Sequence, residues 1–544
     1  MTLEARRVTL GPSAHVDTFT RDSLPPLETW PELRFDLPDL AYPGRLNCAA
    51  ALLDRWVEEG HGERLCVVSP SEQLTYAGLR VRADQVASVL VEEHGVVPGN
   101  RVLLRGPNNP WLVAAWFGVI KAGAVAITTM PLLRPGELRA IAEIGRVELA
   151  ICDHRFTADL EAAAIPGLRL VPYGSGATGD LVEAAERRQP RFQNVPTSAD
   201  DVCMLAFTSG TTGRPKATMH FHRDVLAIAD TFSRHVLRPV QDDLFTASPP
   251  LAFTFGLGQE LIFPLRAGAA TLLLEQAAPE QLLEAIERHR VTVLGTAPTA
   301  YRAMLPKLNE VDVSSLRRCV SAGETLPAAT WEAFHEATGL RIIDGLGSTE
   351  MLHIFVSAAA EDMRPGKTGK QIPGYVAEVQ DEEGGRLPAG KPGLLAVKGP
   401  TGCRYLHGDR QSTYVRGGWN LTGDVYLGDE EGYFAYVSRA DDMIISAGYN
   451  ISGVEVEQAL LLHPSVVEAA VVGVPDEERG MLVKAFVVVK PQAERTPKLV
   501  SELQDFVKSQ IAPYKYPRAL ELVDALPRTS TGKVQRYVLR ATTR

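Results

Sequence analysis

A segment rich in glycine and hydroxyl residues, 204–216, is the part of the sequence best suited to bind phosphate. It begins with an apolar run from Met204 to Phe207. Backbone N–H groups can surround phosphate oxygens where glycine lets the main chain come close, and hydroxyls and cations add donors and charge. The residues that offer these groups are Thr208, Ser209, Gly210, Thr211, Thr212, Gly213, Arg214 and Lys216. A polar hairpin turn is the alternative, but four hydroxyls beside two cations favour a phosphate-binding loop.

This loop differs from the phosphate loop of the common nucleoside triphosphatases. In their pattern, GxxxxGK[ST], a lysine directly follows the second glycine. Here Gly213 is followed by Arg214, Pro215 and Lys216. The sequence therefore predicts a phosphate-binding protein outside that class.

Four further segments combine tight turns with charged or hydroxyl side chains. They are residues 344–350 (DGLGSTE), 419–424 (WNLTGD), 439–450 and 526–533 (LPRTSTGK). Any one such turn is common and carries little functional information. Together and in this order, the five segments resemble the acyl-adenylate-forming (ANL) superfamily, which includes acyl-CoA synthetases, amino-acid adenylation domains and luciferases. The resemblance covers about residues 202–536 and, more loosely, the N-terminal third.

The resemblance implies ATP, Mg²⁺ and coenzyme A as cofactors and gives the matching residues roles in binding them. Residues 208–216 would hold the β- and γ-phosphates, and Thr349 would contact the α-phosphate and the acyl oxygen. Glu350 would hold Mg²⁺, and Asp424 would accept from the ribose hydroxyls with Arg439 nearby. Ala322, Gly323 and Glu324 resemble the strip that lines the adenine pocket. The further residues expected to bind the nucleotide are Asp344, Gly345, Leu346 and Gly347, with Leu346 against the adenine. Leu346 departs from many relatives, which have an aromatic there, but an aliphatic contact can serve.

Three more positions are implied for the later steps of the reaction. Lys533 matches the lysine that serves adenylation, and Asp441 matches the hinge of a mobile C-terminal domain. Gly448 matches the tunnel that takes the pantetheine arm of coenzyme A. An exposed polar linker residue is the alternative interpretation of Asp441.

Two apolar segments are expected to bind the acid, namely 249–258 (PPLAFTFGLG) and 350–355 (EMLHIF). They resemble the benzoate–CoA ligase branch, in particular its 2-aminobenzoate (anthranilate) ligases. We expect a flat slot in which His353 lies near the carboxylate and Thr254 accepts a hydrogen bond from an ortho amino or hydroxyl group. The other expected slot residues are Phe253, Phe255, Gly256 and Ile354. The alternative is that these are ordinary core residues and His353 a hydrogen-bonded buried histidine.

The predicted function is an ATP-dependent aryl acid–CoA ligase, with anthranilate favoured and benzoate second. A medium-chain acyl-CoA synthetase is one alternative. Another is an adenylation enzyme that loads a carrier protein, although such enzymes usually place an Asp in the segment after the phosphate loop, and 249–258 has no acid. A luciferase-like oxygenase shares the same motifs. A non-enzymatic binding protein is disfavoured because Lys533, Glu350 and Asp424 are all present.

The composition of the chain argues against several classes of partner and site. The formal net charge is −10 over 544 residues, which argues against a broad nucleic-acid surface. The six cysteines are scattered without a CxxC pair, which predicts small buried side chains rather than a zinc site or disulfides. The N-terminus lacks an apolar signal region, and the longest apolar stretch, about 111–128, is too short to span a membrane. We expect a cytoplasmic monomer or homodimer.

Helix-like and strand-like segments must position these residues. Strand and helix patterns alternate through most of the chain, as in 101–104, 111–122 and 124–128, which predicts an α/β fold with parallel or mixed sheets between helices. Residues 375–399 are rich in Gly, Pro and β-formers and predict a small β-rich subdomain. A compact α+β unit of about a hundred residues follows a polar cluster at 438–442. The predicted domains are residues 1–440, for ATP and the acid, and a mobile lid at 441–544.

Overall fold

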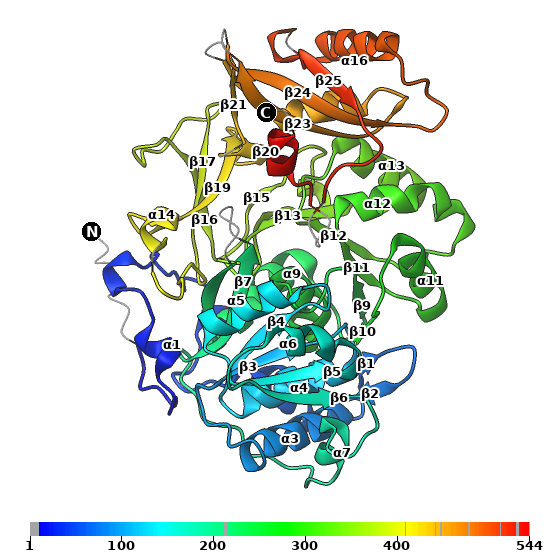
Figure 1. Ribbon diagram of the computed structural model, residues 1–544. Helices are drawn as coiled ribbons and strands as arrows, with labels where there is room; N and C mark the ends of the chain where they lie inside the picture. Colours follow the sequence, from blue (N-terminus) through cyan, green and yellow to red (C-terminus); the bar gives the residue numbers. More distant parts are fainter. Residues whose placement is uncertain are drawn as a thin grey trace. The chain divides into compact units, whose positions relative to one another are not determined.

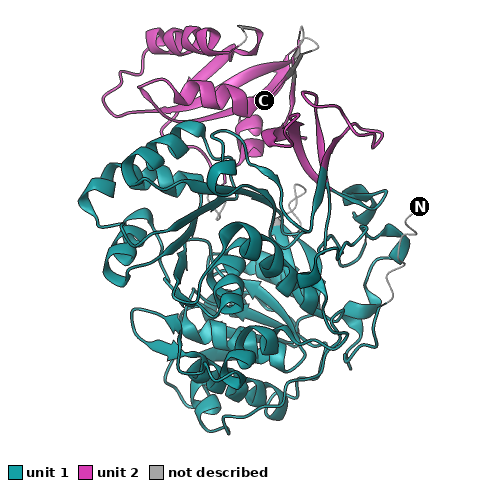
Figure 2. Ribbon diagram, turned by 180° about the vertical axis from the view of Figure 1, so that it is seen from behind, with its two compact units in different colours: residues 1–377, 397–420 teal, residues 378–396, 421–544 magenta. Residues whose placement is uncertain are grey.

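The computed structural model describes residues 10–209, 215–408, 410–440, 442–446, 449–476, 479–511, 513–528 and 533–542. Figure 2 colours its two compact units: unit 1 is residues 1–377 with 397–420, and unit 2 is residues 378–396 with 421–544. The chain passes between the units inside three strands of one sheet. The predicted boundary of a mobile domain at residues 440/441 stays a prediction.

The first sheet of unit 1 has the strand order β6-β5-β3-β4-β7-β8. Its strands pair in parallel except β8, which forms an antiparallel hairpin with β7. The strands are β3 (Arg101–Arg105), β4 (Val125–Thr129), β5 (Leu149–Asp153), β6 (Arg169–Tyr173), β7 (Val202–Ser209) and β8 (Pro215–Phe221). Helices α3 (Tyr76–Glu92), α4 (Pro110–Lys121) and α7 (Leu181–Glu186) lie beside it (Figure 1). Helices α5 (Pro135–Gly145) and α6 (Thr157–Ala163) share a core with Leu103 and Ile127.

Helix α4 and strand β4 account for the longest apolar stretch of the sequence. The Asn109 side chain caps α4 by accepting from the Leu112 N–H at 2.9 Å, and Pro110 supplies a preset first turn. Its one charged residue, Lys121, is buried and pairs with Asp54 at 2.5 Å and Asp84 at 2.8 Å. The stretch is therefore a core helix that runs into a strand, as predicted. Across the described residues no helix combines the length and apolar character that crossing a bilayer requires.

The second sheet of unit 1 has the order β15-β14-β13-β12-β11-β9-β10-β1-β2. Strands β1, β10, β9, β11, β12 and β13 are parallel, and antiparallel strands lie at both edges. The bounds are β1 (Leu65–Val68), β2 (Gln73–Thr75), β9 (Leu244–Ala247), β10 (Ala270–Leu272), β11 (Val293–Thr296), β12 (Arg318–Ala322), β13 (Ile342–Gly347), β14 (Ile354–Ser357) and β15 (Lys370–Gln371). The core beside it includes residues of α11 (Pro279–His289), α12 (Pro298–Met304) and α13 (Ala328–Thr338).

Three helical stretches of unit 1 contain a π-helical segment. They are η3 (Ala50–Asp54) leading into α2 (Arg55–Glu58), α8 (His222–Ile228) followed by η5 (Ala229–Leu237), and α9 (Thr254–Leu257), η6 (Gly258–Ile262) and α10 (Phe263–Ala267). Such π segments are rare and frequently occur at functional sites. The third stretch begins at Thr254, inside the segment predicted to bind the acid.

A third sheet contains β16 (Val376–Gln380), β17 (Pro392–Lys398), β18 (Val415–Arg416), β19 (Trp419–Gly428) and β20 (Phe434–Arg439). The C-terminal sheet has the order β22-β21-β24-β23, with β25 parallel to β24. Its strands are β21 (Ile444–Ser446), β22 (Tyr449–Ile451), β23 (Val466–Asp476), β24 (Gly480–Val489) and β25 (Ala519–Leu522). Helices α15 (Gly453–Leu461) and α16 (Pro497–Gln510) share its core, and α17 (Arg536–Ala541) packs on β23. The predicted α/β class, β-rich subdomain and C-terminal α+β unit are confirmed.

The shorter helices are α1 (Phe19–Asp22), α2 (Arg55–Glu58) and α14 (Gln411–Tyr414).

Candidate active site

The predicted phosphate loop joins the two strands of the β7–β8 hairpin. Thr208 lies opposite Lys216 and Ser209 opposite Pro215, so the strands hold both ends of the loop in register. Residues 210–214 lie outside the described residues. Lys216 is half-buried, and burial together with the positive charge of Arg410 lowers its pKa, while Glu350 acts in the opposite direction. A cation and a carboxylate thus lie close enough to interact at one end of the loop.

The two strips predicted to hold the adenine lie side by side. Strands β12 and β13 are parallel neighbours, with Ser321 opposite Asp344 and Ala322 opposite Gly345. Gly323 follows β12 with φ +89°, a conformation that favours glycine, and no heavy atom lies within 4 Å of the place a Cβ would take. Two strips about twenty residues apart in sequence therefore meet at the carboxyl ends of adjacent strands, where ligands of parallel sheets usually bind.

Asp344 offers an unpaired acceptor in this strip. Its Oδ1 is buried with no hydrogen-bond partner, and burial raises its pKa to about 8. Leaving a buried acceptor unpaired costs about 1–3 kcal/mol. The side chain is therefore suited to receive an N–H from a bound base.

The turn between β13 and β14 carries the predicted reaction residues. Glu350 accepts a hydrogen bond from the Tyr405 hydroxyl at 2.6 Å, and the Ser348 and Tyr414 hydroxyls lie 3.1 Å apart. Leu352 has φ +69°, which is costly for a residue with a side chain. The turn places the half-buried Thr349 and Glu350 directly before the fully buried His353.

His353 lies in a cage of aromatic rings. Its ring centroid is 4.5 Å from that of Phe263 and 5.6 Å from those of Phe232 and Phe255, and its edge lies over Gly258, where a Cβ would come within 2.4 Å of the ring. Burial lowers the pKa of His353 to about 3, so the ring is neutral. Neither ring nitrogen has a hydrogen-bond partner in the protein. The Phe255 backbone raises the pKa of His353 against the effect of burial, and a role of His353 in binding the acid stays a prediction.

The remaining predicted acid residues lie on the same two segments as Phe255 and His353, which contact each other. Phe253 precedes α9, Thr254 and Phe255 begin it, and all three are half-buried. Gly256 is packed against the carbonyls of Pro249 and Pro250, at 2.5 and 2.2 Å from the position of a Cβ. Ile354 fills the space beside Gly345, with its Cδ1 2.4 Å from where a Cβ would lie. Residues predicted from two separate segments thus meet around His353.

Sequence reasoning missed a polar clamp that holds this segment. Asn108 donates to Glu260 at 2.6 Å and accepts from the Leu251 N–H at 2.9 Å. Glu260 is completely buried, and burial raises the pKa of its carboxyl well above the usual value. Two signals were available: Asn108 follows a predicted strand, and Gln259-Glu260 interrupts an apolar run. The clamp fixes the backbone before Phe253.

Five predicted residues belong to unit 2, and three of them lie within the described residues. Asp424 is buried opposite Arg439 on β19 and β20, and the Arg439 Nη1 donates to its carboxylate at 2.9 Å. Gly423 has φ +75°, and a Cβ there would lie 3.0 Å from the Arg439 guanidinium. Lys533 is exposed beside the bridge between Arg528 and Val534. Asp441 and Gly448 lie outside the described residues.

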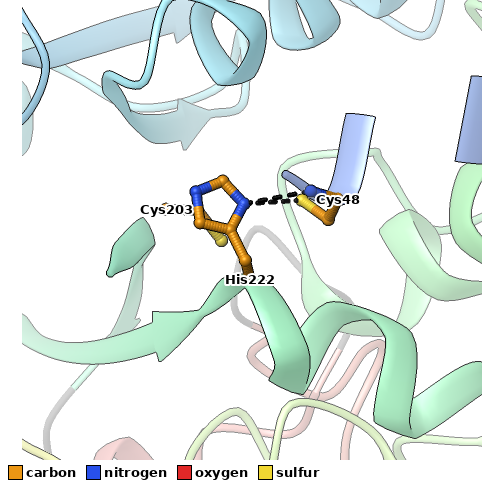
Figure 3. Close-up of side chains that lie close together, drawn as sticks. All are labelled: Cys48, Cys203 and His222. Atoms are coloured by element: carbon orange, nitrogen blue, oxygen red, sulfur yellow. Dashed lines mark hydrogen bonds between the residues drawn. The ribbon is translucent and has the colours of Figure 1, made fainter. Parts of the chain in front are cut away.

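The six cysteines are all buried, as predicted, but two of them are not isolated. Figure 3 shows Cys48, Cys203 and His222 together, with their ligand atoms within 4.8 Å of one another. The His222 Nδ1 accepts from the Cys48 backbone N–H at 3.2 Å, which occupies the lone pair nearest the sulfur. Within the described part of the chain, no fourth donor joins this group. It is best explained as a buried contact that ties residue 48 to β7 and α8.

The chain matches two protein-family models. Residues 53–405 match the AMP-binding enzyme family, and residues 455–533 match the AMP-binding enzyme C-terminal domain. The chain belongs to this family. It is an AMP-forming acid–thiol ligase of the acyl-adenylate-forming superfamily, as the ordered motifs predicted.

Named relatives fall in the predicted branch. The chain is 36% identical to a benzoate–CoA ligase from Thauera aromatica, over 93% of this chain and 97% of that protein. It is 32% identical to a 4-hydroxybenzoate–CoA/benzoate–CoA ligase from Rhodopseudomonas palustris, over 91% and 94%. A crystal structure of an anthranilate CoA ligase with anthranoyl-AMP superposes with a TM-score of 0.88 at 35% identity, covering 93% of this chain and 99% of that one. A benzoate CoA ligase from Burkholderia xenovorans gives 0.84 at 33% identity, covering 91% and 100%.

Proposed function

We infer that this enzyme activates an aromatic carboxylate as its acyl-adenylate, releasing pyrophosphate, and transfers the acyl group to coenzyme A. The observation that carries this is the caged, neutral His353 between aromatic rings, with both ring nitrogens buried and without a hydrogen-bond partner. Flat apolar walls favour an aryl ring, and the relatives with benzoate, hydroxybenzoate and anthranilate substrates support the same class. Anthranilate is the favoured acid and benzoate the second.

The first step needs cations where charge develops, because a carboxylate attacks the α-phosphate of ATP. Thr208, Ser209 and Lys216 border the loop proposed to hold the outer phosphates. Thr349 is proposed to contact the α-phosphate, and Lys533 to bridge it to the acid. The other proposed nucleotide contacts are Gly210, Thr211, Thr212, Gly213, Ala322, Gly323, Glu324, Asp344, Gly345, Leu346, Gly347, Asp424 and Arg439.

The donor set at Glu350 fits Mg²⁺. A carboxylate oxygen is a ligand that Mg²⁺ prefers, and the hydrogen bond from Tyr405 fixes the orientation of the carboxylate. When bound, the ion would neutralise charge on the phosphate oxygens. Glu350 would hold it while Lys216 adds a fixed positive charge.

The second step requires the thiol of coenzyme A to reach the adenylate. We place the hinge for this change at Asp441 and the path of the pantetheine arm at Gly448, both on the family resemblance. Rotation about a few residues is an established way to present a second face of a domain. Asp441→Pro should slow thioester formation about tenfold more than adenylation, measured as separate half-reactions. Equal rates in both half-reactions would remove the hinge from this position.

A panel of acids in an ATP–pyrophosphate exchange assay tests the aryl assignment. Anthranilate, salicylate, benzoate and hydroxybenzoates should exchange faster than hexanoate and octanoate, and the products should form CoA thioesters. A preference for the medium-chain acids would reject the aryl slot. Exchange without any thioester would point to another acceptor, such as a carrier protein.

A further inference from the structure

Gln259 is a buried polar residue without a partner, next to the proposed acid slot. It is completely buried in η6, and neither its amide oxygen nor its amide nitrogen has a hydrogen-bond partner in the protein. Gly258, its neighbour, supports the ring of His353, whose two nitrogens are also unpaired. Two buried polar side chains without a hydrogen-bond partner thus lie on or against η6, Gln259 within it and His353 packed on its first residue.

The packing on the other side of Gln259 is fixed by Gly295 in β11. A Cβ on Gly295 would lie 2.9 Å from the Gln259 Cγ and 3.2 Å from its Oε1. The Gln259 side chain therefore occupies space that a side chain at residue 295 would otherwise fill. The Gly295 carbonyl accepts from the Ser248 N–H at 3.1 Å, so this strand is tied to the start of the acid-binding segment.

The neighbouring Glu260 is paired in part. Asn108 donates to its Oε2 at 2.6 Å and accepts from the Leu251 N–H at 2.9 Å, while the Glu260 Oε1 has no hydrogen-bond partner. The amide of Gln259 differs because both of its polar atoms lack a partner. An unpaired buried amide is destabilising, and a ligand group that completes it is discriminated strongly from one that cannot.

We propose that Gln259, with the space left by Gly295, recognises a hydroxyl or amino group on the ring of the acid. This rests on the proposed aryl-acid function and narrows it, since plain benzoate has no group to pair the amide. An amide offers both a donor and an acceptor, so it suits either substituent. Gln259 is thus a specificity-determining residue. It adds a second polar side chain, beside Thr254, that hydrogen-bonds to a substituent on the ring of the acid.

The test compares kcat/KM for benzoate with that for each 2-, 3- and 4-hydroxy- and aminobenzoate, in wild type and in Gln259→Met. Methionine keeps the length and removes the amide. At least one substituted acid should lose about tenfold to a hundredfold, while benzoate changes little. The melting temperature of the variant without substrate should be unchanged or higher, because an unpaired polar group has been removed; a merely structural glutamine would lower it.

Gly295→Ala provides an independent variant that keeps the glutamine. Its added methyl meets Gln259 at 2.9 Å and should reduce preference for the same substituted acid. Gly136→Ala is the control, because nothing lies within 4 Å of a Cβ there. If both variants leave the ratio of substituted acid to benzoate unchanged for every isomer, or lower all acids alike, the inference is wrong. If wild type adenylates no aryl acid, it is the proposed function that fails.

Discussion

The nucleotide strips and the acid slot differ in what they are made of. The strips, 322–324 and 344–347, are glycine-rich backbone at the ends of two adjacent parallel strands. The proposed acid slot is made of side chains, with His353 caged by rings from two helical stretches and Gln259 packed on Gly295. A backbone site serves one invariant cosubstrate, whereas a side-chain site can be altered residue by residue to suit different acids. Changes in the strips should affect all acids equally, and changes in the slot should affect their ranking.

The largest expected effect is that of Lys533→Ala. This change should slow the adenylation step without altering the binding of ATP or of the acid. Loss of one preorganised electrostatic donor costs on the order of 10²–10³-fold in rate. ATP–pyrophosphate exchange should fall by that amount for every acid, while thioester formation from supplied acyl-AMP is spared. Lys490→Ala, an exposed lysine of the same unit, is the control. Equal loss of both half-reactions would contradict the role given to Lys533.

A smaller effect is expected where the two sites meet, at Gly345. It belongs to the nucleotide strip, yet the space of its missing side chain is taken by Ile354 of the acid slot, 2.4 Å from a Cβ position. Gly345→Ala should force Ile354 aside at a cost of about 1–3 kcal/mol. We expect higher KM values for both ATP and the acid, with the acid ranking altered.

The control for this variant is Gly428→Ala, whose Cβ would make ordinary contacts from 3.6 Å. An effect of Gly345→Ala on ATP alone would show that the two regions are independent.

The smallest expected effect concerns the protonation of His353 and its contribution to the stability of the fold. The pKa of His353 is lowered to about 3 by burial, against 6.5 in an unfolded chain. As pH falls below 6.5 the unfolded chain takes up a proton that the folded chain does not, so stability is lost between pH 6.5 and 3. At pH 5.5 this loss is on the order of 1 kcal/mol. His353→Phe should therefore lose less stability than wild type between pH 8 and 5.5 in urea unfolding. Parallel losses would mean that His353 is protonated in the folded enzyme.

Much of the site could be predicted because its motifs are local. The turn 344–350 and the segment 204–216 contain their own glycines and hydroxyls, and a strand that ends in such a turn presents backbone groups by itself. The order of these turns was sufficient for the family and the α/β class. His353, Phe255 and Ile354 were also predicted from short apolar segments, and the structure brings them together.

The sequence by itself determined the strips proposed to bind the nucleotide, because they depend on residues adjacent in the chain and on backbone conformations that glycine permits. Only the tertiary structure decided which side chains in the acid slot lack partners. Asn108 reaches Glu260 across 152 residues, while the preceding residue, Gln259, packs against Gly295. Two neighbouring polar residues look alike in the sequence. Their difference arises from long-range packing, which pairs one oxygen of Glu260 and leaves the whole amide of Gln259 without a hydrogen-bond partner.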